Sequence, residues 1–268
     1  MTDSPPPQPT TPPLNRATGA RRNWAWVIVS IVLIGAAGVL WSGQLRRDHL
    51  QFRLLATDAD AVVRDRQLVD FATRQAVPLY AANCAVCHGA DMTGNTVLGA
   101  PNLKDQVWLY GSGSVFDIER TLLYGIRSGH GKSHNVSEMP AFGSTGVLSP
   151  TDIRNVVQYV LQLSLRPHRA DAAADGRMVY FGIANCADCH ASDGRGNPDY
   201  GAPDLTANVW NTGGSEQALY DAIYFGQHHI MPAWIGTLSL TQIRALAVYV
   251  YYASHQRAGD RYVSANDP

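Results

Sequence analysis

Two short stretches of this sequence carry residue types that could do chemistry, and the two are almost identical. Residues 83–88 read NCAVCH and residues 185–190 read NCADCH, so in both places two cysteines two residues apart precede a histidine. The chain has four cysteines, and all of them lie in these stretches. Because none is left for a disulfide framework, the cysteines are expected to serve chemistry rather than cross-linking.

Three kinds of site use cysteines at this spacing. A thioredoxin-like redox disulfide requires a surrounding βαβ pattern, which the sequence lacks. A zinc site would need Cys84 and Cys186, which are 102 residues apart, to come together. The C-x-x-C-H run is instead the signature of haem c, in which two thiols form thioethers and the histidine binds iron. The sequence therefore predicts two covalently bound haem c groups, on Cys84, Cys87 and His88 and on Cys186, Cys189 and His190.

The other face of each iron needs a second ligand, and methionine is a candidate. Two of the five methionines, Met139 and Met231, are followed by proline at matching places, 51 residues after His88 and 41 after His190. Proline stiffens the loop that presents the sulfur. The others lie in the N-terminal tail or on the motif side of the haem: Met1, Met92 and Met178. We therefore expect Met139 and Met231 to be the second axial ligands.

Four histidines are possible rivals of these methionines, because the segments before Met139 and Met231 differ in length and contain them. A bis-histidine haem would have a lower potential than a His/Met haem, since thioether ligation raises it. Three aromatic residues are further candidates for contacts with haem propionates, or else core residues. The rival histidines are His130, His134, His228 and His229, and the aromatic residues are Trp108, Tyr110 and Trp210.

The chain repeats itself after residue 70. Ala100-Pro101 and Ala202-Pro203 are separated by 102 residues, as are Trp108 and Trp210. A period near 100 fits tandem globular domains, with a boundary in the polar stretch 165–176. Each repeat shows helical periodicity before its motif and closes with an amphipathic helix. These closing helices begin at Ser149-Pro150-Thr151-Asp152, which has an N-cap serine and a proline at the first position, and at Ser239-Leu240-Thr241-Gln242, which fits a capping box.

The N-terminal part has a different composition. No charged residue occurs from Asn23 to Leu45, and about 20 apolar residues at 1.5 Å per residue span a bilayer core of roughly 30 Å. Tryptophans flank the run, which favours an anchor over a cleaved signal peptide. Arginines lie on both sides, so the positive-inside rule gives no orientation. Since haem c is attached outside the bacterial cytoplasm, the haem domains are expected in the periplasm.

The predicted fold class is all-α: one N-terminal transmembrane helix followed by two tandem class I cytochrome c domains. The net charge of −1 argues against a nucleic-acid partner. The expected segments are a disordered proline-rich cytoplasmic arm (1–22), the transmembrane helix (23–45), a linker (46–66), the first cytochrome c domain (67–168), the second (169–258) and a C-terminal tail (259–268).

Over roughly residues 20–255 the chain resembles a known family, the membrane-anchored dihaem subunit III (CcoP or FixP) of cbb3-type cytochrome c oxidase. The stretches CAVCHG, GAPNLKDQVWLYG, GIRSGH and EMPAFG carry the resemblance in the first repeat. CADCH, GAPDLTANVW and IMPAW carry it in the second, although Ala191 stands where glycine usually follows the motif histidine and WNTGG replaces WLYGG.

The resemblance implies electron relay rather than catalysis by this chain. It would take electrons from a donor cytochrome c or the quinol-oxidising complex and pass them to the monohaem cytochrome c subunit and the haem–copper catalytic subunit. It would sit in membrane lipid as a single-pass protein of the bacterial inner membrane. Two alternatives are an anchored dihaem cytochrome that serves a dehydrogenase or acts as a shuttle, and a dihaem peroxidase with an open iron position; a sensor would need an output domain, which the sequence does not show.

Overall fold

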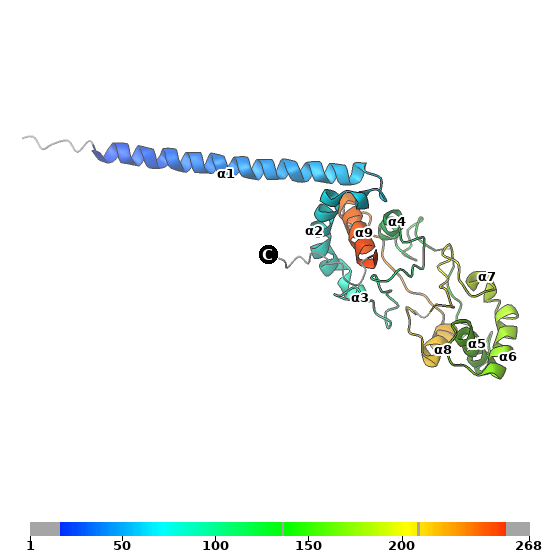
Figure 1. Ribbon diagram of the computed structural model, residues 1–268. Helices are drawn as coiled ribbons and strands as arrows, with labels where there is room; N and C mark the ends of the chain where they lie inside the picture. The colour runs from blue at the N-terminus through cyan, green and yellow to red at the C-terminus, as the bar shows by residue number, and fades with distance from the viewer. Residues whose placement is uncertain (1–16, 136, 208–209, 256–268) are drawn as a thin grey trace, which may run out of the picture. The chain divides into compact units, whose positions relative to one another are not determined.

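The computed structural model describes residues 17–135, 137–207 and 210–255 (Figure 1). Most of the proline-rich arm and the whole C-terminal tail expected from the sequence lie outside these ranges. The described chain is helical and contains isolated β-bridges but no strand, which confirms the all-α prediction. Two units are distinguished, residues 1–50 and 51–268, and each is described by itself.

The first unit consists of the long helix α1, Ala17–Ala56, which continues into the start of the second unit. It is the one helix in the described residues that is long and apolar enough to cross a membrane, over Trp26–Ala56. Its large apolar side chains are exposed, with Ile34 73% and Val39 72% accessible. Exposure of this kind is costly in water and favourable in lipid. The helix extends beyond the expected span 23–45 because the polar residues that follow also have good helix propensity.

The two repeats begin with matching helices that lead into the cysteine motifs. In the first, the 3-10 turn η1 (Val62–Arg64) precedes α2 (Arg66–Asn83), and the Asp65 carboxylate caps α2 by accepting bonds from the amides of Gln67 and Leu68. In the second, α6 (Ala170–Phe181) plays the same part. The stretch 165–176, expected as a domain boundary, is thus half helical. Each motif then forms a single turn, α3 (Ala85–His88) or α7 (Ala187–His190).

A second pair of helices lies between each motif and its Met-Pro segment. α4 (Val115–Tyr124) and α8 (Glu216–Phe225) are both capped by a serine, Ser114 or Ser215, whose hydroxyl accepts an amide bond from the first turn. Both end at a glycine with positive φ, Gly125 at 72° and Gly226 at 74°. Both glycines are C-cap residues, and glycine adopts such a positive φ without the steric strain that other residues would have.

The closing helices, α5 (Pro150–Leu163) and α9 (Leu240–His255), begin where the sequence predicts. Ser149 and Asp152 form a reciprocal capping box at α5. At α9 the Ser239 amide donates to the Gln242 side chain, and the Gln242 amide donates back to the Ser239 hydroxyl. Each reciprocal pair satisfies amide groups that the first helical turn leaves without intrahelical partners.

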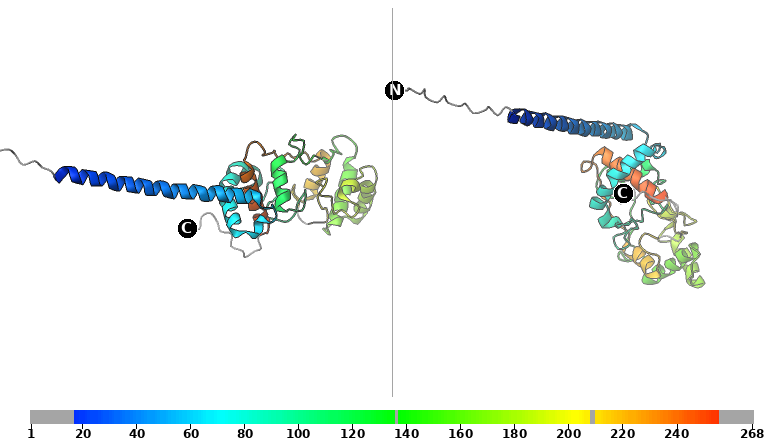
Figure 2. Two further views of the ribbon diagram at one scale, coloured as in Figure 1. Left: turned by 90° about the horizontal axis from the view of Figure 1, so that it is seen from above. Right: turned by 60° about the vertical axis from the view of Figure 1, so that its left-hand side comes forward.

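Each closing helix packs on helices of the other repeat (Figure 2). α9, from the second repeat, lies against α2 and α4 of the first repeat, whereas α5, from the first repeat, lies against α6 and α8 of the second (Figure 1). The exchange is anchored by the Arg244–Glu119 ion pair between α9 and α4, 2.7 Å long and about nine-tenths buried on both sides. The two sequence repeats are therefore interlocked.

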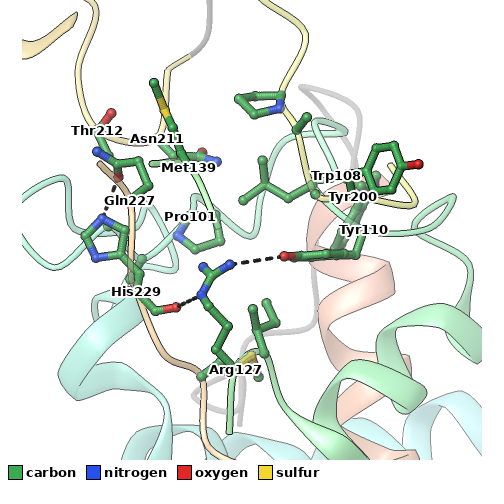
Figure 3. A pocket seen from close by; sticks show the side chains of 18 of the residues that line it. Pro101, Trp108, Tyr110, Arg127, Met139, Tyr200, Asn211, Thr212, Gln227 and His229 are labelled. Carbon is green, nitrogen blue, oxygen red and sulfur yellow. Dashed lines mark hydrogen bonds between the residues drawn. The ribbon is translucent and has the colours of Figure 1, made fainter. Parts of the chain in front are cut away.

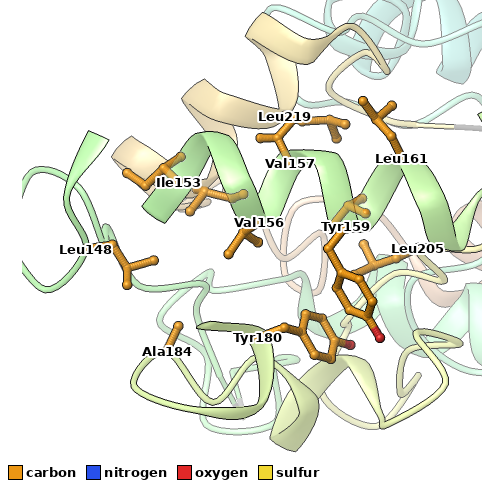
Figure 4. Packing of buried hydrophobic residues seen from close by; sticks show 12 residues of the cluster. Leu148, Ile153, Val156, Val157, Tyr159, Leu161, Tyr180, Ala184, Leu205 and Leu219 are labelled. Atoms are coloured by element: carbon orange, nitrogen blue, oxygen red, sulfur yellow. The ribbon is translucent and has the colours of Figure 1, made fainter. Parts of the chain in front are cut away.

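The core on α5 shows how this exchange is stabilised. Tyr159 on α5 packs edge-to-face on Tyr180 of α6, with ring centroids 5.1 Å apart, and Leu219 of α8 joins the same cluster (Figure 4). In the first repeat, Tyr80 of α2 contacts Tyr249 of α9, with ring centroids 5.8 Å apart. Burial of each such aromatic contributes on the order of 2 kcal/mol. Each closing helix thus covers the core of the opposite repeat.

Candidate haem sites

Each CxxCH motif is wound into one helical turn. The amides of Cys87 and His88 both donate to the Cys84 carbonyl, at 3.1 and 2.9 Å, and the amides of Cys189 and His190 do so to Cys186 at 3.2 and 2.9 Å. Residues three and four apart in a helical turn lie on one face. The turn therefore presents two thiols and one imidazole to the same space, which is the arrangement that covalent haem attachment needs.

Both motif histidines are oriented by a backbone carbonyl. His88 Nδ1 lies 3.0 Å from the Pro101 carbonyl oxygen, and His190 Nδ1 lies 3.1 Å from that of Pro203. A carbonyl only accepts, so Nδ1 carries the proton and Nε2 keeps its lone pair for a metal. Burial lowers the pKa of both imidazoles, and the hydrogen bonds to the proline carbonyls oppose this in part. The neutral imidazole that results is the form that ligates iron.

The loops carrying the two prolines are built alike. Asn95 and Ala100 exchange backbone hydrogen bonds in the first, and Asn197 and Ala202 do so in the second. Gly94, at φ 85°, lies so close to this turn that a Cβ would meet the Ala100 carbonyl oxygen at 2.6 Å. The close approach of Gly94 thus fixes the position of the turn that carries Pro101, whose carbonyl orients His88.

No disulfide joins these cysteines in the described structure. Burial raises the pKa of Cys84 and of Cys186 to about 11, with a smaller contribution from the neighbouring cysteine of each motif. Among the described residues, no three His, Cys, Asp or Glu side chains gather as a group that could hold a metal ion. Nothing in the described structure brings the two CxxC halves together as a shared zinc site would require.

The residue after each motif histidine has a left-handed backbone. Gly89 has φ 79° and Ala191 has φ 63°. The carbonyl of each accepts a 2.7 Å hydrogen bond from a buried tyrosine, Tyr80 or Tyr180. The sequence departure at Ala191 therefore preserves the geometry, at the cost of strain that glycine avoids.

Met231 lies against the first repeat. Its amide donates to the Ile126 carbonyl at 3.0 Å, and the Ile126 amide donates back to the Met231 carbonyl at 2.9 Å. Further along the segment, the Trp234 amide donates to the Leu122 carbonyl at the end of α4. A Cβ on Gly125 would meet the Met231 carbonyl oxygen, so only glycine fits there. The Met231 segment thus lies beside the end of α4, in the first repeat.

Met139 occupies the reciprocal place in the second repeat. Its carbonyl accepts from the Gln227 amide at 3.1 Å, and the Tyr224 carbonyl accepts from the amides of Gly143 and Ser144. The Met139 side chain packs on the same cluster of buried residues as Cys186 does. Each Met-Pro segment therefore pairs, through its backbone, with the other repeat rather than with its own. The reason is the exchange of α5 and α9, each of which follows its Met-Pro segment into the opposite repeat.

A cavity of about 630 Å³ joins the two motifs and both Met-Pro segments. Its lining is mainly apolar, as a macrocycle requires, and includes one buried donor without a partner in the described structure, the indole Nε1 of Trp210. A haem propionate is an acceptor that would satisfy such a group. In lining and donor set the cavity fits haem c: the four cysteines could supply the thioether bonds, and His88, His190, Met139 and Met231 could supply the axial ligands.

The remaining aromatic candidates lie at the cavity but differ in role. The Trp108 ring rests against the backbone of Gly113, where a Cβ would collide with it. Tyr110 stacks on His134, with centroids 4.4 Å apart, and its hydroxyl points toward Arg127 (Figure 3). Trp108 therefore has a packing role, whereas Tyr110 belongs to a polar group.

Of the four rival histidines, only His229 lines the cavity among the described residues. Its Nε2 lies 2.7 Å from the Gln227 side-chain oxygen, and burial, followed by the Arg127 cation, lowers its pKa. The other three contact protein groups: His130 stacks on Tyr124, His134 bonds Thr121, and His228 pairs with Glu138. Of the methionines set aside, Met92 is buried and Met178 is exposed.

Sequence reasoning missed the cationic side chain that lines the cavity, Arg127. Its backbone has φ 48°, unusual for a residue other than glycine, and its guanidinium contacts three oxygens (Figure 3). The GIRSGH stretch contains it, but nothing in the spacing of that stretch distinguishes a cavity cation from a surface one.

Comparison with known proteins identifies the family of this chain. A family model described as "Cytochrome C oxidase, cbb3-type, subunit III" matches residues 71–160 and 171–250, one match for each repeat. The chain belongs to this family. Its repeats are therefore cytochrome c domains, and covalent haem c is the cofactor that the family implies.

Named relatives extend over most of the chain. The cbb3-type cytochrome c oxidase subunit CcoP of Cereibacter sphaeroides is 36% identical over 236 residues, covering 85% of this chain and 80% of the relative. The subunit FixP of Bradyrhizobium sp. (strain ORS 278) is 41% identical over 210 residues, covering 78% and 70%. FixP of Rhizobium meliloti is 31% identical over 243 residues, covering 91% and 80%. As a member of the subunit III family, this chain is part of an oxidase complex.

Proposed function

We propose that this subunit III carries two haem c groups and relays electrons into the oxidase without catalysing oxygen reduction itself. One haem would be held by Cys84, Cys87 and His88, with Met231 as the second ligand. The other would be held by Cys186, Cys189 and His190, with Met139. The supporting observation is the pair of histidines, each with Nδ1 bound to a proline carbonyl and Nε2 left for iron.

Haem c supplies a one-electron Fe(III)/Fe(II) couple when bound, and a His/Met ligand set favours outer-sphere transfer over oxygen binding. The residues of this chain position the axial ligands and limit the access of water. The Pro101 and Pro203 carbonyls hold the imidazoles, the Met-Pro segments present the sulfurs, and the apolar lining limits access of water. Two centres in one continuous cavity would form a short relay.

The proposed electron path starts at a donor cytochrome c or the quinol-oxidising complex. It ends at the monohaem cytochrome c subunit and the haem–copper catalytic subunit of the oxidase. α1 would anchor the chain in the lipid of the bacterial inner membrane as a single span. The haem domains would lie in the periplasm, because haem c is attached outside the cytoplasm. Membership of the oxidase subunit family favours this role over a dehydrogenase-linked cytochrome or a peroxidase.

The test is purification of the full chain in mild detergent from a host that attaches haem c. We expect two covalently bound haems in each wild-type chain and one haem in each double-cysteine variant, C84A/C87A or C186A/C189A. We also expect the wild-type chain to co-purify with an oxygen-consuming haem–copper subunit. Binding of carbon monoxide to the reduced chain at full haem content would contradict the His/Met assignment. Recovery of the chain with full haem but no oxidase partner would contradict the relay.

A further inference from the structure

Arg127 places a cation inside the cavity that joins the two motifs. Its Nε donates to the His229 carbonyl at 2.8 Å, and one terminal nitrogen lies 3.4 Å from the Tyr110 hydroxyl and 3.5 Å from the Ser137 carbonyl (Figure 3). All three partners are neutral oxygens, and the last two contacts are long. A half-buried guanidinium held in this way keeps most of its charge uncompensated.

The described carboxylates that line the cavity do not supply the missing anion. Asp117 accepts from the amide and hydroxyl of Ser112, both at 2.7 Å. Glu138 pairs with His228 at 2.8 Å, and Asp188 accepts from the Asn185 side chain. Arg127 takes part in none of the ion pairs found in the described residues, and it is the only lysine or arginine among the described cavity-lining residues.

The position of Arg127 is fixed by both Met-Pro segments. It follows Ile126, which exchanges two backbone bonds with Met231, and its own amide donates to the His134 carbonyl at 3.0 Å. Its guanidinium reaches Ser137, two residues before Met139. The backbone holds φ 48°, a conformation that strains a non-glycine residue and persists only where the surroundings enforce it. The cation is therefore held between the two segments that present the methionines.

We infer that the Arg127 guanidinium binds haem propionate carboxylate in this cavity, and that this one charge contributes to the redox potential of the relay. The inference rests on the proposed function, because the carboxylate belongs to the proposed haem groups. A planar guanidinium with free N–H donors suits carboxylate, and a buried carboxylate needs such a partner to stay ionised.

The sign of the effect follows from charge. Reduction adds an electron to the iron, so a nearby cation favours the reduced state, and its removal lowers the midpoint potential. In a medium of effective dielectric constant near 20, a unit charge about 12 Å from a redox centre changes the oxidised-to-reduced ratio about tenfold. For a one-electron couple that is ~59 mV.

The experiment compares R127Q and R127K with R195Q in the full chain, purified in detergent with its haem attached. Arg195 is an exposed arginine paired with Asp193, so R195Q is a matched loss of surface charge. Four quantities are measured: covalent haem per chain, the optical signature of Fe–S(Met) ligation, the midpoint potentials by spectroelectrochemistry, and their dependence on pH between 5 and 8. We expect R127Q to keep both haems and both methionine ligands, with the oxidised-to-reduced ratio of at least one haem raised about tenfold at fixed potential.

Two further results identify propionate as the partner. R127K keeps the charge and should retain a potential close to that of the wild type. In R127Q the carboxylate has lost its cation, so its pKa rises and the midpoint potential should become dependent on pH. If R127Q does not accumulate, R127H at pH 8 replaces it, because an imidazole of pKa about 6.5 is then neutral.

Midpoint potentials equal to those of R195Q would overturn the inference, as would a shift without any new pH dependence. Loss of methionine ligation in R127Q would also overturn it, because Arg127 would then be a brace for the Met-Pro segments. Absence of covalent haem in the wild-type chain would instead contradict the proposed function, so the two failures are distinguishable.

Discussion

The ion pair between Glu119 and Arg244 offers the sharpest test of the helix exchange. The Arg244 Nε donates to Glu119 at 2.7 Å, and one terminal nitrogen donates to the carbonyls of Leu54 and Thr57 at 3.2 and 3.1 Å. The side chains are only 13% and 10% exposed. Arg244 on α9 thus joins α4 to the chain just before η1, and the buried cation depends on Glu119 for its counter-charge.

E119Q removes the charge and leaves the shape nearly unchanged. Removing one partner of a buried ion pair costs about 3–5 kcal/mol, because the remaining charge stays buried without compensation. In a unit of this size each kcal/mol corresponds to roughly 2–4 °C, so the melting temperature should fall by about 6–20 °C. The assay is thermal and urea unfolding of the full chain in detergent, followed by circular dichroism and by the haem spectrum.

D193N provides the control. The Asp193–Arg195 pair is exposed, at 58% and 75%, and an exposed pair contributes about 0–1 kcal/mol. The double variant E119L/R244M should recover much of the lost stability, since apolar residues can replace a buried pair, although the bonds to Leu54 and Thr57 remain lost. If E119Q destabilises the chain no more than D193N does, α9 is not held on α4 as described, and the exchange of helices is refuted.

Three further predictions concern single residues. G125A should lower the free energy of unfolding by about 2 kcal/mol or more and weaken methionine ligation at the first haem, because the added Cβ meets the Met231 carbonyl. The control is G129A: Gly129 also has a positive φ, 80°, but no atom lies within 4 Å of its Cβ position, so the loss should be smaller. Equal losses in unfolding experiments would contradict the contact. A191G should raise the free energy of unfolding by about 1 kcal/mol in urea titrations by relieving a left-handed backbone, and a loss of stability would argue against that conformation. Burial, and then the Arg120 cation, lowers the pKa of His134. The unfolded chain therefore binds more protons than the folded chain, and the free energy of unfolding should fall as the pH drops below about 6.5. H134Q should reduce this dependence of stability on pH, and an unchanged dependence would remove His134 as its source.

Much of the fold was predictable because it depends on local signals. The CxxCH turns, the Ser149 and Ser239 caps and the apolar N-terminal run are set by residues close together in sequence. The extension of α1 to Ala56 was not predicted, because the sequence signal used for it was hydrophobicity, whereas helix formation continues through polar residues.

The partner of each closing helix was beyond local reasoning. Both repeats carry the same pattern, so α5 and α9 present similar apolar faces, and neither periodicity nor capping states which repeat a helix covers. The deciding contacts, such as Arg244 with Glu119, join residues 125 apart in the chain. For the same reason the sequence does not show which motif Met139 and Met231 would each complete.

The cation at Arg127 illustrates a second gap. Its role depends on two segments, 137–139 and 227–231, that meet only in the folded chain. A sequence pattern can predict that an arginine follows a helix end. It does not predict that the arginine faces a cavity without a carboxylate partner.

The most direct test of the central claim is to determine which methionine ligates which haem. In C186A/C189A, which keeps only the haem on Cys84 and Cys87, the Fe–S(Met) signature is measured with M231L or with M139L added. The crossed arrangement predicts that M231L abolishes the signature and that M139L leaves it intact, with the reverse in C84A/C87A. Loss of the signature with M139L in C186A/C189A, and its survival with M231L, would contradict the account.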